Sequence, residues 1–176
     1  LFVDPGRGAY GETGDAALYR SSAVHGGIRI DHQDPYPANK PYYSDEFRQS
    51  VAGPASTRIM SDGISISHDG YRRLGINTVT RSWTFSGSSI HIADTIQAEG
   101  THYMERSFVT PHAVKIEPNK VIIGDSAIIR VSGKPPSQRP VTIWQAYGIS
   151  ITGTQIVFDE TSTGPWHGTL EIESII

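Results

Sequence analysis

Short runs in which apolar and polar residues alternate recur along the chain. Residues 64–68 alternate with a period of two, and so do residues 79–85 and 90–94. Such alternation is typical of β-strands with one buried face, whereas helical periodicity is scarce in this sequence. Residues 86–88 (Ser-Gly-Ser) separate the last two runs, which predicts a hairpin with a loop of about three residues.

Runs of β-branched and aromatic residues predict more strands in the second half of the chain. They cover residues 103–110, 114–117, 121–124, 127–131, 141–147, 155–159 and 168–174. Pro118 and Asn119 mark a turn between two of these runs, and residues 133–140 are expected to form a Pro-rich loop. Many short strands separated by turn signals predict an all-β fold, an antiparallel β-sandwich that forms a single domain over residues 1–176.

The first part of the chain has a different character. Residues 1–56 are expected to be a loop-rich opening segment, in which only residues 27–31 are typical of a strand, and residues 57–176 carry the main strands. The stretch from Asp34 to Tyr43 is rich in Pro and Tyr. Long loops of this kind are often functional. Two interpretations remain open: a surface that touches a partner, or a loop draped over the sandwich edge.

Composition narrows the class of protein. The chain has 176 residues, of which 37% are hydrophobic, enough for one core but without the run of about 20 apolar residues that a membrane-spanning helix needs. The net charge of −3 gives no basic face for nucleic acid. The absence of cysteine excludes disulfides and thiol nucleophiles. We expect the start at Leu1 to be artificial, and we favour a periplasmic or secreted bacterial location over a cytoplasmic one.

Several segments, in order, resemble heparinase II/III-like polysaccharide lyases. The resemblance begins with residues 1–6 (Leu-Phe-Val-Asp-Pro-Gly), Tyr10 and residues 19–25 (Tyr-Arg-Ser-Ser-Ala-Val-His). It continues through residues 67–74, 90–96, 100–102, 147–148 and 166–176. It therefore covers nearly the whole chain.

The resemblance implies a larger parent, in which an α/α-toroid of helices precedes this sandwich. Proteins of this family cleave uronate-containing polysaccharides, such as heparin, heparan sulfate or alginate, by β-elimination. Their toroid supplies a Tyr and a His, and their sandwich supplies a His from a His-x-His-x-Asp stretch. That stretch would lie before Leu1, so we expect no catalytic residue within this chain and no activity of the chain alone.

The chemistry explains this expectation. Elimination removes the proton on C5, next to the carboxylate, and expels the glycosidic oxygen on C4, which requires a base and an acid in reach. Charge that builds on the carboxylate needs preorganised donors or cations. By resemblance, Tyr10, Tyr19 and Arg20 are the candidate contacts to an acidic polysaccharide.

Similar proteins also imply a zinc ion in the sandwich. Asp4 and His25 correspond to two of its ligands, and the third is a His upstream of Leu1. Carboxylate and imidazole both suit zinc, and we expect a structural role for the ion. Gly26 and Gly27 stand where the family has Asn-Thr. The alternative is that Asp4 forms a turn and His25 is a hydrogen-bonded residue.

The remaining histidines, at positions 32, 68, 91, 102, 112 and 167, lack ligand spacing. We expect His91 and His102 to be half-exposed and His68 to bond within its turn. Residues 72–73 (Arg-Arg) and Arg81 are interpreted as solvated rather than as sugar contacts. The three Trp residues are expected to pack in the core or at an edge.

Two other functions stay open. One is a non-catalytic carbohydrate-binding module that uses Tyr36, Tyr42 and Tyr43 as its platform. The other is a structural domain that buttresses a neighbour. The residues encoded upstream of Leu1 discriminate between them and the lyase, because only the lyase needs a His-x-His-x-Asp stretch there.

Overall fold

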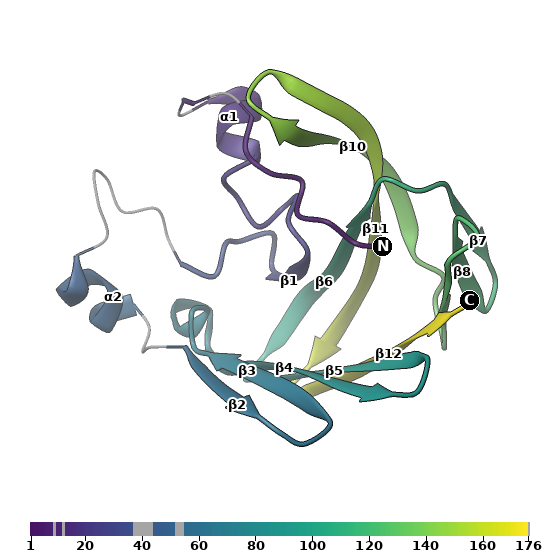
Figure 1. Cartoon of the computed structure of the whole chain (residues 1–176). Coiled ribbons are helices and arrows are strands. Elements are labelled where there is room, and N and C mark those ends of the chain that lie inside the picture. Colours follow the sequence, from purple (N-terminus) through teal and green to yellow (C-terminus); the bar gives the residue numbers. More distant parts are fainter. Residues whose placement is uncertain (9, 12, 37–43, 52–54, 176) are drawn as a thin grey trace.

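Two facing antiparallel sheets form the body of the computed structural model, which describes residues 1–8, 10–11, 13–36, 44–51 and 55–175 (Figure 1). The predicted all-β sandwich is confirmed. The described helices are short: α1 (Gly14–Leu18), α2 (Asp45–Val51) and the 3₁₀ turn η1 (Arg72–Leu74). None of the helices in these ranges has the length and apolar character that crossing a membrane would need.

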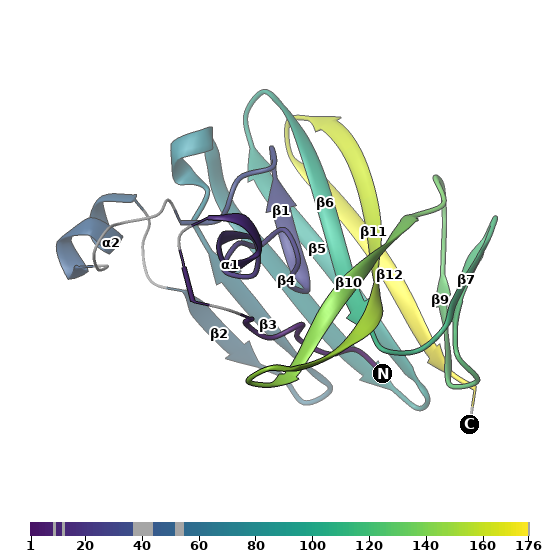
Figure 2. The same ribbon diagram turned by 90° about the horizontal axis from the view of Figure 1, so that it is seen from above.

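The larger sheet has eight strands and the smaller has four. In spatial order the larger sheet contains β2 (Ser56–Ile59), β3 (Gly63–His68), β4 (Ile76–Ser86), β5 (Ser89–Ala98), β12 (Trp166–Ser174), β9 (Ala127–Arg130), β8 (Lys120–Ile123) and β7 (Val114–Glu117). The smaller sheet contains β1 (Gly27–Ile30), β6 (Thr101–Thr110), β11 (Ile149–Thr163) and β10 (Ser137–Ala146). Figure 2 shows β10 and β11 crossing above the strands of the larger sheet.

The main core lies between the two sheets. Alternation along β6 sends Phe108 inward, where it packs with Ile92, Ile129 and Ile156. The next residue, Val109, faces the other side of the smaller sheet. The opening segment therefore covers this outer face, where a second cluster joins Tyr19, Val24, Val109, Val141 and Ile143.

Two turns that the sequence predicts are confirmed. β4 and β5 form the expected hairpin, with Ser86 paired to Ser89, so the loop is Gly87-Ser88 and is shorter than predicted. Gly87 has a φ of +57°, which a two-residue hairpin loop favours and glycine adopts at little cost. Pro118 and Asn119 connect β7 to β8, as expected.

The prediction of a loop over residues 133–140 was wrong in its second half. β10 begins at Ser137 and includes Pro140, which pairs with Thr154. β10 is the last strand of the smaller sheet, and a proline without an N–H is tolerated on such an edge strand. Its partner β11 is also longer than the predicted run 155–159: its first four residues, Ile149 to Thr152, are exposed and pair with β10.

In the opening segment, the predicted strand at residues 27–31 is confirmed as β1, which pairs with β6. Asp34 anchors the following loop: its Oδ1 accepts hydrogen bonds from the amide (2.7 Å) and the hydroxyl (2.6 Å) of Ser22. Tyr36 is half-buried, whereas Tyr42 and Tyr43 lie outside the described residues. The interpretation of these three tyrosines as a binding platform therefore gains no structural support.

Candidate functional site

Backbone hydrogen bonds dock the N-terminal segment against the smaller sheet. The amide of Val3 donates to the carbonyl of Val109 (2.9 Å), and the amide of Trp144 donates to the carbonyl of Pro5 (2.8 Å). Gly6 has a φ of +72°, and a Cβ at this position would lie 2.8 Å from the carbonyl oxygen of Trp144. Only glycine fits there without strain, and it lets the chain turn immediately after Asp4.

Asp4 and His25 contact each other across this turn. Nδ1 of His25 lies 2.7 Å from Oδ2 of Asp4, while the amide of Gly6 donates to Oδ1 of Asp4 at 2.8 Å. Nε2 of His25 lies 3.1 Å from the carbonyl oxygen of Tyr19. Partial burial of Asp4 opposes its ionisation, but the hydrogen bonds from His25 and Gly6 outweigh this effect and lower its pKa.

This pair has the chemistry of a partial zinc site. A metal-bound histidine usually donates its second ring N–H to a carbonyl or carboxylate, and Tyr19 supplies such a carbonyl to Nε2 of His25. Nδ1 then faces Asp4. Within the described ranges, however, no group of three or more His, Cys, Asp or Glu residues could hold a metal ion. Two ligands are present, and a closed structural zinc site needs four.

Two of the three predicted sugar contacts lie on the surface of the opening segment. Tyr10 has 78% of its surface exposed. Arg20 is also exposed, and its Nη1 lies 3.4 Å from the carbonyl oxygen of Gly11. Sequence reasoning missed Arg7, whose guanidinium stacks over the ring of Tyr10 at 4.6 Å from its centroid. The spacing Arg-x-x-Tyr within a Gly-rich stretch was the available signal.

Tyr19 lies in a different environment. Only 6% of it is exposed, and its ring meets Trp144 edge-on at 6.3 Å between centroids. Its hydroxyl accepts the amide of Thr142 at 2.8 Å. The side chain of Tyr19 thus attaches the opening segment to β10. The interpretation of its hydroxyl as a sugar contact does not fit this buried position.

The structure corrects two interpretations of charged residues. Arg81 is not a solvated strand end, because its guanidinium forms two hydrogen bonds with the fully buried carboxylate of Asp94. His102 is not half-exposed: it is 8% exposed and lies between Asp31 and the carbonyl of Glu99. The expectation for His68 is confirmed, because its Nδ1 accepts the amide of Gly70 within its turn.

The fold and the N-terminal segment define the class of protein: an antiparallel β-sandwich domain with a carboxylate–imidazole pair beside its smaller sheet. The protein-family model described as "Heparinase II/III-like, C-terminal" matches residues 1–158 of the sequence. The chain therefore belongs to the heparinase II/III-like family. Among curated protein sequences, none is significantly similar to it.

Solved structures of larger proteins contain a similar fold. Heparan sulfate lyase HepC from Pedobacter heparinus superposes with a TM-score of 0.69 at 13% identity, over 97% of this chain and 28% of that protein. A heparinase III gene product gives a TM-score of 0.71 at 13% identity, over 99% of this chain and 28% of that protein. A further heparinase III structure gives a TM-score of 0.63 at 16% identity, over 98% of this chain and 27% of that protein. The chain thus spans little more than a quarter of the length of these proteins.

Proposed function

We propose that this chain is the C-terminal β-sandwich of a polysaccharide lyase that cleaves uronate-containing polysaccharide by β-elimination. The substrate class is that of heparin, heparan sulfate or alginate. In this proposal an α/α-toroid precedes the sandwich in the parent chain, and the cleft between them holds the substrate. The observation that carries the proposal is the family match over residues 1–158.

The described residues have a limited part in this chemistry. The base that removes the C5 proton and the acid that protonates the leaving oxygen come from the toroid and from the stretch upstream of Leu1. Arg7 and Arg20 place two guanidinium groups on the exposed opening segment near Tyr10. A guanidinium pairs well with a carboxylate, so these residues would orient the uronate and stabilise charge that builds on its carboxylate.

Asp4 and His25 would hold a zinc ion together with an upstream histidine. Zinc would supply a structural cross-link here rather than a nucleophile, because β-elimination needs no metal-bound hydroxide. The hydrogen bond between His25 and the carbonyl of Tyr19 supports this assignment, since it fixes which ring nitrogen faces Asp4. The pair would then anchor the Gly-rich segment that carries Tyr10.

The test compares the parent protein with residues 1–176 alone on heparan sulfate, heparin and alginate. Absorbance of the 4,5-unsaturated uronate reports elimination. We expect product from the parent on at least one substrate and none from the isolated chain. A parent that binds these polymers without forming unsaturated ends would contradict the proposal. Product from residues 1–176 alone would show that the base and the acid lie within them.

A further inference from the structure

A charged cluster lies between the two sheets, away from the Asp4–His25 pair. Asp94 of β5 is 0% exposed. It accepts hydrogen bonds from Nε (2.6 Å) and Nη2 (2.9 Å) of Arg81 on β4. From the opposite sheet, Nη1 of Arg106 lies 3.8 Å from Oδ2 of Asp94, beyond hydrogen-bonding distance. Two guanidinium groups thus share one carboxylate, and the charge of Glu160 also acts on Arg106.

Arg106 is largely but not fully buried, with 11% of its side chain exposed. Its Nη1 has no hydrogen-bond partner within the part of the chain that the structure describes. The guanidinium instead lies over the rings of Trp166, at 5.1 Å, and Phe158, at 5.8 Å. Burial lowers the pKa of Arg106, and the carboxylates of Asp94 and Glu160 oppose this shift. An unpaired buried donor of this kind is costly unless something else satisfies it.

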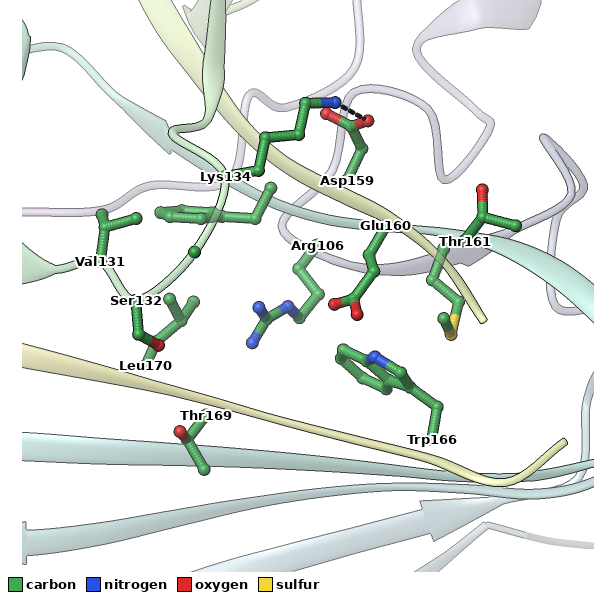
Figure 3. A pocket seen from close by; sticks show the side chains of 13 residues that line it. Arg106, Val131, Ser132, Lys134, Asp159, Glu160, Thr161, Trp166, Thr169 and Leu170 are labelled. Carbon is green, nitrogen blue, oxygen red and sulfur yellow. Dashed lines mark hydrogen bonds and ion pairs between the residues drawn. The ribbon is translucent and has the colours of Figure 1, made fainter. Parts of the chain in front are cut away.

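A cleft of about 410 Å³ opens onto this guanidinium. This volume is within the range of roughly 300–1,000 Å³ that small-molecule sites occupy. Figure 3 shows Arg106, Glu160 and Trp166 side by side in the cleft, with Ser132 and Thr169 on its far side. At the mouth, Nζ of Lys134 pairs with Oδ2 of Asp159 at 2.5 Å.

Two features of the sheet create this space. A Cβ on Gly168 would lie 2.3 Å from Cη2 of Trp166 and 3.2 Å from Nη1 of Arg106, so the glycine leaves room for both. The pairing of β9 with β12 ends at Arg130 and Glu171. Beyond this point the two segments diverge, and a second hollow of about 520 Å³ adjoins the first at Ser132 and Thr169.

The cleft lies on the opposite side of the smaller sheet from the Asp4–His25 pair. Ser107 donates its hydroxyl to the carbonyl of His25 at 2.8 Å, which places its side chain on the outer face. Arg106 is its neighbour in β6, and successive side chains of a strand point to opposite faces. The two sites are therefore separate.

The charges in the cleft select a class of ligand. Lys134 is paired with Asp159, and Arg81 with Asp94, so the groups left over are the guanidinium of Arg106 and the carboxylate of Glu160. Glu160 repels any anion that approaches Arg106, whether an inorganic anion or the carboxylate of a sugar acid. A sugar acid offsets this repulsion, because its carboxylate accepts from Arg106 while one of its hydroxyls donates to Glu160.

We infer that this cleft binds one acidic sugar residue, with the sugar carboxylate on the part of the Arg106 guanidinium that lines the cleft and a sugar hydroxyl on Glu160. The indole of Trp166 forms a wall for the ring. The inference rests on the proposed function in that it takes the polysaccharide to be acidic. It adds a second saccharide site, which holds polymer at a distance from the position of cleavage.

Isothermal titration calorimetry tests the inference, with sodium glucuronate, glucose, sodium acetate and sodium sulfate as separate probes. We expect saturable binding of glucuronate, and binding of the other three that is at least about tenfold weaker. Arg106→Gln should weaken glucuronate binding by roughly ten- to a hundredfold, which is the range for a lost charged hydrogen bond. Sulfate or acetate binding as tight as glucuronate would overturn the sugar assignment.

Matched variants locate the site. Arg58→Gln, on the exposed strand β2, should leave glucuronate affinity unchanged. Glu160→Ala alters an exposed side chain, so it provides a folded variant even if Arg106→Gln fails to fold. It should weaken glucuronate binding by roughly tenfold, because a hydrogen bond to a charged carboxylate is lost. Unchanged affinity in the folded cleft variants would overturn the inference.

The two proposals fail separately. Glucuronate binding is measured without cleavage, so a parent that binds glucuronate at Arg106 but forms no unsaturated product contradicts only the lyase. A parent that forms product but does not bind glucuronate at Arg106 contradicts only the second site.

Discussion

Nδ1 of His25 lies 2.7 Å from Oδ2 of Asp4, although the two residues are 21 positions apart in sequence. The contact joins the N-terminal segment to the turn that precedes β1. The other ring nitrogen of His25 meets the carbonyl of Tyr19, so one imidazole connects three parts of the opening segment. The arrangement of the exposed residues Tyr10 and Arg20 therefore depends on this histidine.

Substitution of His25 tests the zinc assignment. In the parent protein, His25→Ala should lower zinc content, measured by atomic emission, together with the melting temperature, because a ligand and a cross-link are lost together. His91→Ala is the matched control, since His91 is half-exposed on β5 and lies 3.5 Å from Glu171. Unchanged zinc content in His25→Ala would show that His25 is not a zinc ligand, and Asp4 would then be interpreted as an ordinary turn residue.

Tyr19→Phe separates packing from binding. The variant keeps the ring against Trp144 but removes the hydroxyl that accepts the amide of Thr142. We expect the free energy of unfolding to fall by about 1–3 kcal/mol, because the amide loses its acceptor. Urea denaturation measures this change. The affinity for polysaccharide should stay the same. A loss of affinity without a loss of stability would instead indicate that the hydroxyl of Tyr19 contacts the sugar.

Arg20→Gln tests the exposed face of the opening segment. In the parent, this variant should raise KM for a uronate polymer by roughly tenfold, because a charged hydrogen bond to a carboxylate is lost. Its melting temperature should change little, since surface substitutions are usually within about 0.5 kcal/mol. Arg58→Gln on β2 is the control for overall charge. Equal KM values in the two variants would show that Arg20 does not contact the substrate.

Strand alternation predicts much of this fold because one face of most strands is buried. The hairpin of β4 and β5 was found from its two alternating runs and the intervening turn. Pro140 and the exposed residues at the start of β11 concealed two further strand segments. Pro140 is tolerated because β10 is an edge strand, and the start of β11 is a strand because it pairs with β10. Both depend on the order of strands in the sheet.

The buried pair Arg81–Asp94 was missed because Arg81 was interpreted as a solvated residue. A loop of two residues, Gly87-Ser88, places Arg81 opposite Asp94 in the hairpin, where the two charges compensate each other. This pairing depends on the register of the hairpin, which the sequence pattern did not predict. Arg106 comes from the other sheet, and its approach to Asp94 depends on the packing of the two sheets.

Asp94→Ala tests the energetic role of this cluster. Removing the carboxylate leaves Arg81 buried without its partner and brings two positive charges together. We expect a loss of about 3–5 kcal/mol in the free energy of unfolding, measured by urea denaturation. Glu173→Ala is the matched control, because it breaks the more exposed pair with Arg130. Glu173→Ala should lower the free energy of unfolding by about 1 kcal/mol or less. Similar losses in both variants would show that burial does not distinguish the two pairs.

His102 should make stability depend on pH near neutrality. Burial opposes its protonation, but hydrogen bonds to Oδ2 of Asp31 (2.7 Å) and to the carbonyl of Glu99 (2.8 Å) outweigh this and raise its pKa above the ordinary 6.5. The folded state therefore binds the proton more tightly than the unfolded state does. The resulting stabilisation is fully present below pH 6.5 and is lost as pH rises through the raised pKa.

His102→Gln isolates this effect, because glutamine still forms hydrogen bonds but does not titrate in this range. Urea denaturation of both proteins at a series of pH values from slightly acidic to slightly alkaline measures the difference in their free energies of unfolding. We expect the advantage of the wild type to shrink steadily as pH rises above 6.5, the ordinary pKa. His68, whose pKa burial lowers, contributes the opposite slope equally to both proteins and cancels in the difference. A difference that is constant with pH would mean that Asp31 does not stabilise the protonated form of His102.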